Sequence, residues 1–237
     1  NSGDHPNMRL HTKIMFCGYK AGDAHGGPSA MAKLLDQSLT EKDGFCPMHL
    51  SALYLRWWQS DGFDTGAVFA AVFSGIEAGV EPARAVKRAH QDLQGQTAGC
   101  NPAHRIMPLA LHSCIATCDI GTVARQEAQI THYDPIAGDM AALSAYLCRL
   151  LIEGYSWEEA KELTCDLEPE AWRVMQGAKL SRDGFAPNVL HTALMFLDAD
   201  SSIDRAIMFA GPNNYCPVIV APIAALRGDQ IPQVNGV

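Results

Sequence analysis

The chain has 237 residues, a formal net charge of −8 at pH 7 and a hydrophobic content of 48%. This length suits one large domain or two small ones and can bury a substantial core, and the apolar content excludes a disordered chain. The negative charge argues against nucleic-acid binding and against docking on an anionic membrane, because both need a basic face.

Eight cysteines are spread along the chain, and none forms a Cys-x-x-Cys pair. We expect them to be reduced and mostly buried, which favours a cytoplasmic protein. We find no apolar run of about 18 residues, so no membrane span is expected, and no signal-peptide pattern. Residues 1–7 are expected to be a tag remnant or a disordered tail ahead of a single domain over residues 8–230.

Helical spacing dominates the hydrophobic pattern along the whole chain. A first helix is expected over about residues 10–21. Apolar residues then recur three and four positions apart in the stretches Leu50–Trp57, Met140–Leu151 and Val189–Leu197. The segment Ser156–Glu159 has the pattern of a capping box. No stretch alternates long enough to require a strand, so the sequence predicts one compact all-α domain.

A tight turn follows the first predicted helix. The segment Gly22–Ser29 contains three glycines and a proline, with Asp23 and His25 near its apex. One interpretation is purely structural: a helix C-cap is followed by an N-cap at Gly27, with Pro28 in the first helical turn. The other interpretation is a functional turn that carries Asp23 as a catalytic candidate.

A second polar turn ends at Asp64, which we expect to cap a helix starting near Thr65. The paired Trp57 and Trp58 just before it either pack against neighbours or line a groove. If the turn is functional, Asp64 is its candidate acidic residue.

The segment Thr97–Leu111 concentrates unusual residues before an apolar stretch. Gly99 allows a close backbone approach, and Pro102 suits a first helical turn. The N–H groups of such a helix start can hold an anion, with His104 and Arg105 beside them. The structural alternative is a capped helix start with Arg105 in a surface ion pair.

Two later turns are also rich in polar residues. In the turn around His132 and Tyr133, a lone histidine is usually structural, and Asp134 is expected to cap the next helix. In the turn before Val218, asparagines either cap or bind a sugar or a base edge. Cys216 either has a lowered pKa at a helix start or is a buried, inert thiol, the latter being favoured.

The segment Gly99–Leu109 resembles the ribose-gripping loop of the ADP-ribosylglycohydrolases, Gly-Asn/Cys-Gly-x-Ala-Met-Arg-x-x-Pro-Leu. Asn101 stands where the family usually has Gly, and His104 where it usually has Met. Gly22–Gly26 is similar to the family's Gly-Asp-Ala-Leu-Gly, and Thr131–Ala137 to its Thr-His-x-x-Pro-x-Ala. The resemblance runs from about Leu10 to Gly228 in family order.

This resemblance implies an all-α orthogonal bundle and a glycohydrolase pocket. It makes Asp23 and Asp64 the catalytic candidates. The substrate contacts that it implies are Cys100, Asn101, His104, Arg105, His132, Tyr133, Asn213, Asn214 and Tyr215. The implied partner is a small-molecule or ADP-ribosylated substrate; the oligomeric state is not implied.

The chain departs from the family at the two acidic turns that bind a pair of magnesium ions. The first turn reads Gly26–Ser29 without a carboxylate, and in the second Pro212 and Asn214 stand at the two expected aspartates. Magnesium prefers carboxylate oxygens, so we expect no metal ligands and no cofactor, or at most one weakly bound Mg²⁺.

Two functions stay open. The first is a divergent hydrolase of an N- or O-glycosidic bond in an ADP-ribosyl or nucleoside-like substrate. The second is an inactive member that binds ADP-ribose, a nucleotide or a sugar. A purely structural role is a third.

Overall fold

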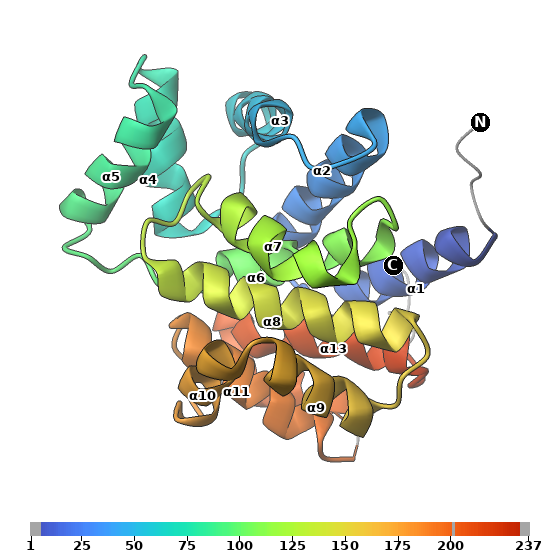
Figure 1. Cartoon of the computed structure of the whole chain (residues 1–237). Coiled ribbons are helices and arrows are strands. Elements are labelled where there is room, and N and C mark those ends of the chain that lie inside the picture. Colours follow the sequence, from blue (N-terminus) through green and yellow to red (C-terminus); the bar gives the residue numbers. More distant parts are fainter. Residues whose placement is uncertain (1–5, 201, 233–237) are drawn as a thin grey trace.

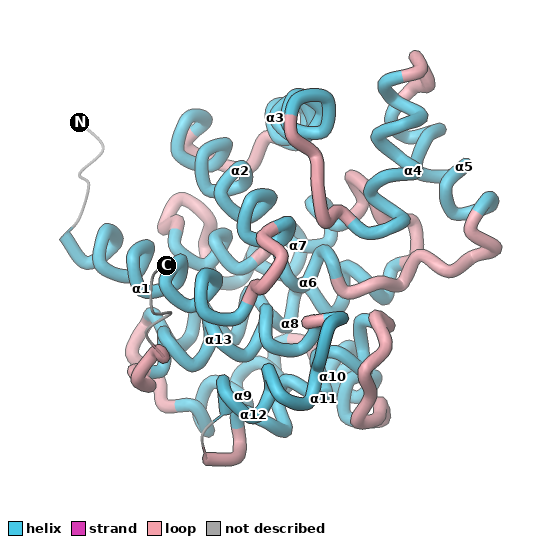
Figure 2. The backbone as a smooth tube through the Cα atoms, turned by 180° about the vertical axis from the view of Figure 1, so that it is seen from behind, coloured by secondary structure: helices cyan, strands magenta, loops and turns pink. Residues whose placement is uncertain are grey.

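The structure is a computed structural model that describes residues 6–200 and 202–232. The described residues form α-helices, three short 3-10 helices and connecting turns, with one isolated bridge between Gly99 and Phe185 and no strand (Figure 2). The helices are α1 (Pro6–Gly22), α2 (Gly27–Lys42), α3 (Pro47–Ser60), α4 (Gly66–Glu77), α5 (Pro82–Asp92), α6 (Asn101–Arg105), η1 (Met107–Leu111), η2 (Thr117–Asp119), α7 (Ile120–Ala128), α8 (Pro135–Ile152), α9 (Trp157–Leu167), α10 (Pro169–Gln176), α11 (Ala186–Leu197), α12 (Ser202–Ala210), η3 (Gly211–Asn213) and α13 (Tyr215–Arg227).

The prediction of an all-α fold is therefore confirmed. Helix α1 begins at Pro6, ahead of Met8, and the rest of the predicted tail, residues 1–5, lies outside the described residues. The capping box at Ser156 is also confirmed, because its side chain and that of Glu159 satisfy each other's backbone N–H groups at the start of α9.

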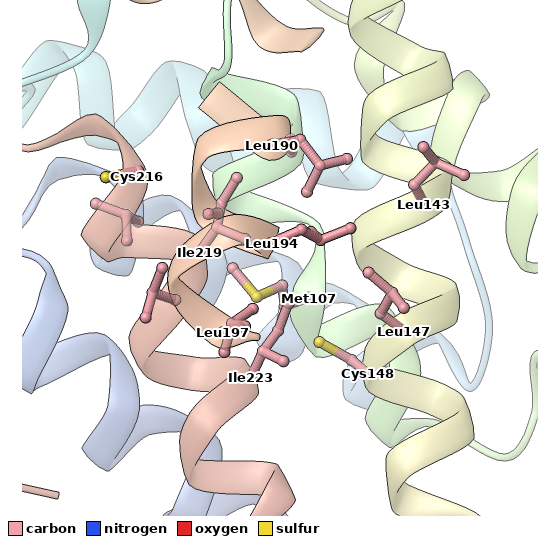
Figure 3. Close-up of a cluster of buried hydrophobic side chains, with 14 of the residues drawn as sticks. Met107, Leu143, Leu147, Cys148, Leu190, Leu194, Leu197, Cys216, Ile219 and Ile223 are labelled. Atoms are coloured by element: carbon pink, nitrogen blue, oxygen red, sulfur yellow. The ribbon is translucent and has the colours of Figure 1, made fainter. Parts of the chain in front are cut away.

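Helix α8 crosses the middle of the molecule and separates two apolar clusters (Figure 1). Asp134 caps it as expected, by accepting a hydrogen bond from the N–H of Ile136 at 3.0 Å. Leu143 and Leu147 face the cluster built with α11 and α13 (Figure 3). Tyr146 belongs to the second cluster, with α2, α3, α4 and α5.

The expectation that no segment is apolar enough to cross a membrane is wrong for α8. Within the described part of the chain it passes that test of length and composition, with a mean hydropathy of 1.3 over 18 residues. However, 78% of this helix is buried inside the protein, so its apolar surface is already covered by the surrounding helices.

Helices α1 and α13 cross in close contact, so the first and last described α-helices of the chain pack against each other. A Cβ atom at Gly18 would lie 2.5 Å from Cα of Pro222, and one at Gly22 would lie 2.2 Å from the carbonyl oxygen of Pro217. Only glycine fits at such contacts. The end of α1 is therefore held against the start of α13.

Candidate functional site

A pocket of about 390 Å³ opens where loops from distant parts of the sequence meet. The turns between α1 and α2, before α4, before α8 and between α12 and α13 all contribute to it, together with the start of α6. All the predicted site residues except Arg105 and Tyr133 line this pocket. Those that line it are Asp23, Asp64, Cys100, Asn101, His104, His132, Asn213, Asn214 and Tyr215.

Asp23 holds the turn between α1 and α2. Its Oδ1 accepts a hydrogen bond from the N–H of Gly26 at 2.9 Å. Its Oδ2 accepts one from the N–H of Ser29 at 2.9 Å and one from the Ser29 hydroxyl at 2.7 Å. Gly26 has a φ of +90°, which glycine adopts without strain. Asp23 thus places a fixed negative charge at the start of α2, where the helix dipole favours it.

Asp64 contacts the same helix start from the loop before α4. Its Oδ2 accepts a hydrogen bond from the N–H of Gly27 at 2.9 Å. Burial raises the pKa of the Asp64 carboxyl; the Gly27 hydrogen bond opposes this shift, and the charge of Asp23 adds to it. The prediction that Asp64 caps α4 is wrong: Thr65 occupies the N-cap position of that helix, and no side chain caps it.

The start of α6 forms another part of the pocket wall. Cys100 is buried, and burial raises the pKa of its thiol to about 12, so it lines the pocket as a protonated, unreactive group. The Asn101 side chain is held at both ends. Its Nδ2 donates to the carbonyl of Thr65 at 3.0 Å, and its Oδ1 accepts from Nη1 of Arg105 at 3.1 Å.

His104 lines the pocket with a buried imidazole ring. Its side chain is only 4% exposed, and burial lowers the pKa of the imidazole to about 4, so the ring is neutral at physiological pH. Its Nε2 has no hydrogen-bond partner among the described residues. This nitrogen is itself shielded from solvent, so it is an unpaired polar atom of the protein interior, which is costly.

Arg105 lies behind the pocket, which corrects its prediction as a substrate contact. The side chain is fully buried, and its Nε donates to Oε1 of Glu127 at 2.7 Å. The hydroxyl of Tyr54 donates to the same oxygen at 2.9 Å. The alternative of a surface ion pair is wrong as well, since both partners of this pair are 0% exposed. Arg105 instead supports Asn101 from behind.

His132 lines the pocket, whereas the next residue points away from it. Burial, reinforced by the charge of Arg105, lowers the pKa of His132 well below its usual value, so this ring is neutral too. Tyr133 is 48% exposed, and its ring packs on that of His90 with centroids 4.7 Å apart. Tyr133 is not among the residues that line the pocket, and its contact with a substrate stays a prediction.

The turn between α12 and α13 is tied to the turn that carries Asp23. Asn214 has a φ of +52°, and its Nδ2 donates to the carbonyl of Gly22 at 2.9 Å. Nε2 of His25 lies 2.9 Å from the carbonyl oxygen of Pro212. These two contacts join the first and last polar turns of the chain into one wall of the pocket.

Tyr215 and Cys216 follow at the start of α13. Burial raises the pKa of the Tyr215 hydroxyl and raises that of the Cys216 thiol to about 12. The preferred interpretation of Cys216 as a buried, inert thiol is therefore supported over a reactive one. Asn213, just before them, is exposed at the pocket rim.

Sequence reasoning missed the loop before α11. Gly184 lines the pocket, and its carbonyl accepts a hydrogen bond from the N–H of Cys100 at 3.1 Å. A Cβ atom at Gly184 would lie 3.2 Å from Cζ of Tyr215. The only local signal was a glycine between polar residues, which indicates a turn and carries no information about its distant partner.

The donor set at the pocket does not fit a pair of magnesium ions. Two carboxylates are present, and Asp23 already accepts three hydrogen bonds. The turn between α12 and α13 contributes amides and a phenol instead of further acids. Within the described residues, no group of three or more His, Cys, Asp or Glu side chains is placed to hold a metal ion. Magnesium sites are built mainly from carboxylates and water.

Comparison with known proteins agrees with this architecture. A solved structure described as "ADP-ribosylglycohydrolase-related protein complex" superposes with a TM-score of 0.70 at 22% sequence identity, covering 94% of this chain and 89% of that one. No curated protein sequence matches the chain significantly. The family described as ADP-ribosylglycohydrolase matches residues 18–234, which is most of the chain. The chain therefore belongs to the ADP-ribosylglycohydrolase family.

Proposed function

We propose that this protein hydrolyses an N- or O-glycosidic bond of an ADP-ribosyl or nucleoside-like substrate without a di-magnesium centre. Family membership supports a glycohydrolase-like role in general. The substrate class and the independence from magnesium are the proposed part. The observation that carries the proposal is the pair of carboxylates, Asp23 and Asp64, held at one helix start on the wall of one pocket.

The environment of Asp64 suits a general acid, and Asp23 lies at the same helix start. Burial and the neighbouring charge of Asp23 raise the pKa of Asp64, which favours its protonated form. Asp23 accepts three hydrogen bonds and supplies negative charge beside it. A carboxyl group with a raised pKa is suited to donate a proton as a general acid.

In the proposed reaction, Asp64 acts first as acid and then as base. The bond between the anomeric carbon and the leaving nitrogen or oxygen breaks, its electron pair stays on the leaving atom, and that atom takes the proton of Asp64. A water molecule then bonds to the anomeric carbon and returns a proton to Asp64. The charge of Asp23 stabilises the positive charge that develops on the sugar between these events.

The neutral side chains of the pocket are suited to hold the sugar and its substituents. His104 contributes a neutral imidazole to the lining, and the amide of Asn213 stands at the rim. Tyr215 adds a hydroxyl that stays protonated because burial raises its pKa. Amide, imidazole and hydroxyl groups match the oxygen-rich surface of a ribosyl ligand.

A binding module without activity is the second candidate, and the hydrogen bonding of Asp23 favours it. All three hydrogen bonds of this carboxylate serve the turn itself, and the opposite turn carries Pro212 and Asn214 where the family has acids. Such a pocket can hold ADP-ribose, a nucleotide or a sugar without cleaving it.

One set of assays separates the two candidates. The protein is incubated with ADP-ribosyl-arginine, an O-linked ADP-ribosyl conjugate and a nucleoside, each with EDTA and with Mg²⁺, and release of the sugar is measured. The hydrolase proposal expects turnover that is the same with chelator and with metal. Calorimetric binding of ADP-ribose without turnover of any substrate supports the binding module, and turnover that requires Mg²⁺ contradicts the proposed metal independence.

A further inference from the structure

We propose that Arg105 and Thr131 fix His132 as the tautomer that carries its proton on Nε2, so that the pocket presents a permanent N–H donor to an oxygen atom of the ligand. The assignment of the tautomer rests on the structure of the free protein alone. The ligand half of the inference rests on the proposed function.

The guanidinium group of Arg105 sets the direction of the hydrogen bonds behind the pocket. Its Nη2 donates a hydrogen bond to Oγ1 of Thr131 at 2.9 Å. A guanidinium group has donors only and stays protonated in proteins, so the direction of this hydrogen bond is fixed. The hydroxyl oxygen of Thr131 is therefore an acceptor toward Arg105, and its single proton is free for another partner.

The other partner of that hydroxyl is the ring of His132. Oγ1 of Thr131 lies 2.6 Å from Nδ1 of His132, and the Thr131 side chain is 0% exposed. If Nδ1 carried the proton, the Thr131 hydroxyl would accept twice and its own proton would have no acceptor in a buried position. Such an unsatisfied buried donor is unfavourable. Nδ1 is therefore the acceptor, and in the neutral ring the proton is on Nε2.

The position of Nε2 directs this donor to the pocket. A Cβ atom at Gly99 would lie only 3.6 Å from Nε2 of His132, and both residues line the pocket. His132 is 1% exposed, and within the described structure the only hydrogen bond of its ring is the one at Nδ1. The Nε2–H group is thus an unpaired donor of a buried side chain, with the pocket in front of it.

The ring also stays neutral, because burial and the charge of Arg105 both disfavour a second proton on it. A neutral N–H donor accepts nothing and carries no charge to attract a carboxylate. The group that it recognises is therefore an acceptor with a free lone pair. On the sugar and phosphate part of a ribosyl ligand these acceptors are the ribose hydroxyls and the phosphate oxygens.

Nitrogen-15 NMR of the histidine rings tests the tautomer without any ligand. The chain has nine histidines, and the His132→Gln variant identifies the signals of His132. The expected spectrum shows a protonated Nε2 and an unprotonated Nδ1 for His132 in the wild-type protein and in Thr131→Ser. In Thr131→Val the Nδ1 signal is expected to shift because its donor is gone. A proton on Nδ1 of His132 in the wild-type protein overturns the proposal, whether or not the valine variant folds.

Calorimetry with adenosine and with ADP tests the ligand half. Thr131→Val is expected to raise the Kd by about tenfold, the size of one hydrogen bond, and Thr131→Ser to leave it within about twofold. An effect with both ligands assigns the donor to the nucleoside that they share, and an effect with ADP alone assigns it to a phosphate. Equal Kd values in wild-type protein and Thr131→Val overturn this half. No binding of either ligand to the wild-type protein overturns it together with the proposed function, while the NMR result stands on its own.

Discussion

The Gly27 amide donates a hydrogen bond to the Asp64 carboxylate at 2.9 Å, although 37 residues separate the two in sequence. The contact joins the first residue of α2 to the loop before α4. With Asp23 bound to the same helix start through Ser29, it makes both candidate carboxylates part of one rigid unit. The candidate chemistry of this protein therefore depends on how α2 begins.

Replacing Asp64 by Asn tests its role as acid and base. The amide oxygen still accepts from Gly27, so the fold is expected to survive, but the group has no proton to transfer. Hydrolysis is expected to fall by about 10²–10⁴-fold, as measured by release of ADP-ribose. Asp61→Asn, at an exposed position in the same loop that does not line the pocket, is the matched control and is expected to keep full activity. Equal rates for the two variants would remove Asp64 from the mechanism.

Replacing Gly27 by Ala tests the contact between the two loops. The new Cβ would lie 2.0 Å from the carbonyl oxygen of Asp64, so backbone has to move. We expect a loss of several kcal/mol in the free energy of unfolding, measured by urea denaturation. Gly75→Ala is the control. Gly75 lies inside α4, and a Cβ atom there would lie 3.5 Å from Cβ of Ala85 in α5, which is an ordinary van der Waals contact. That change is expected to stabilise by about 0.5–1 kcal/mol.

The buried ion pair behind the pocket is expected to be sensitive to loss of one charge. Glu127→Gln leaves the guanidinium of Arg105 buried without its counter-ion, and both partners are 0% exposed. We expect a loss of about 3–5 kcal/mol in the free energy of unfolding. Glu170→Gln removes one partner of an exposed pair with Arg173 and is expected to change stability by less than about 1 kcal/mol. Similar small losses in both variants would contradict the structural role given to Arg105.

His104 is expected to contribute to the loss of stability in acid. Burial lowers its pKa from 6.5 to about 4, so between these values the unfolded chain binds a proton that the folded protein does not. The free energy of unfolding therefore falls as the pH drops from 6.5 to 4, by up to about 3 kcal/mol, and this contribution does not grow below pH 4. In His104→Gln the acid side of the stability curve should be shallower, with the part due to His132 remaining. Denaturation midpoints at pH 7, 5.5 and 4.5 measure the difference.

The helices and the choice of polar turns could be predicted from local patterns. Helical period, capping residues such as Asp134 and helix-start prolines act within one or two turns of chain, and their outcome is decided locally. The partners of those turns could not be predicted in the same way. Asp64 caps α2 rather than α4 because of a tertiary contact with Gly27, and the pairing of Gly99 with Phe185 leaves no local trace.

The burial of individual side chains explains why Arg105 and Tyr133 lie outside the pocket lining. The family resemblance implies that Arg105 is a substrate contact, and its place beside a helix start is compatible with an anion site. Its partner Glu127 lies 22 residues away, and the pair is buried behind the pocket. Tyr133 follows a pocket residue directly and still points outward, since adjacent side chains on this turn face opposite ways. Neither outcome follows from residue type.

A crystal structure of the protein grown with ADP-ribose and Mg²⁺ tests the central claim most directly. Our account predicts the ligand in the pocket between Asp64, His132 and Asn213, with an oxygen of the ligand within hydrogen-bond distance of Nε2 of His132 and no cation between ligand and protein. Two bridged magnesium ions in the pocket, or a ligand bound on another surface, would contradict it.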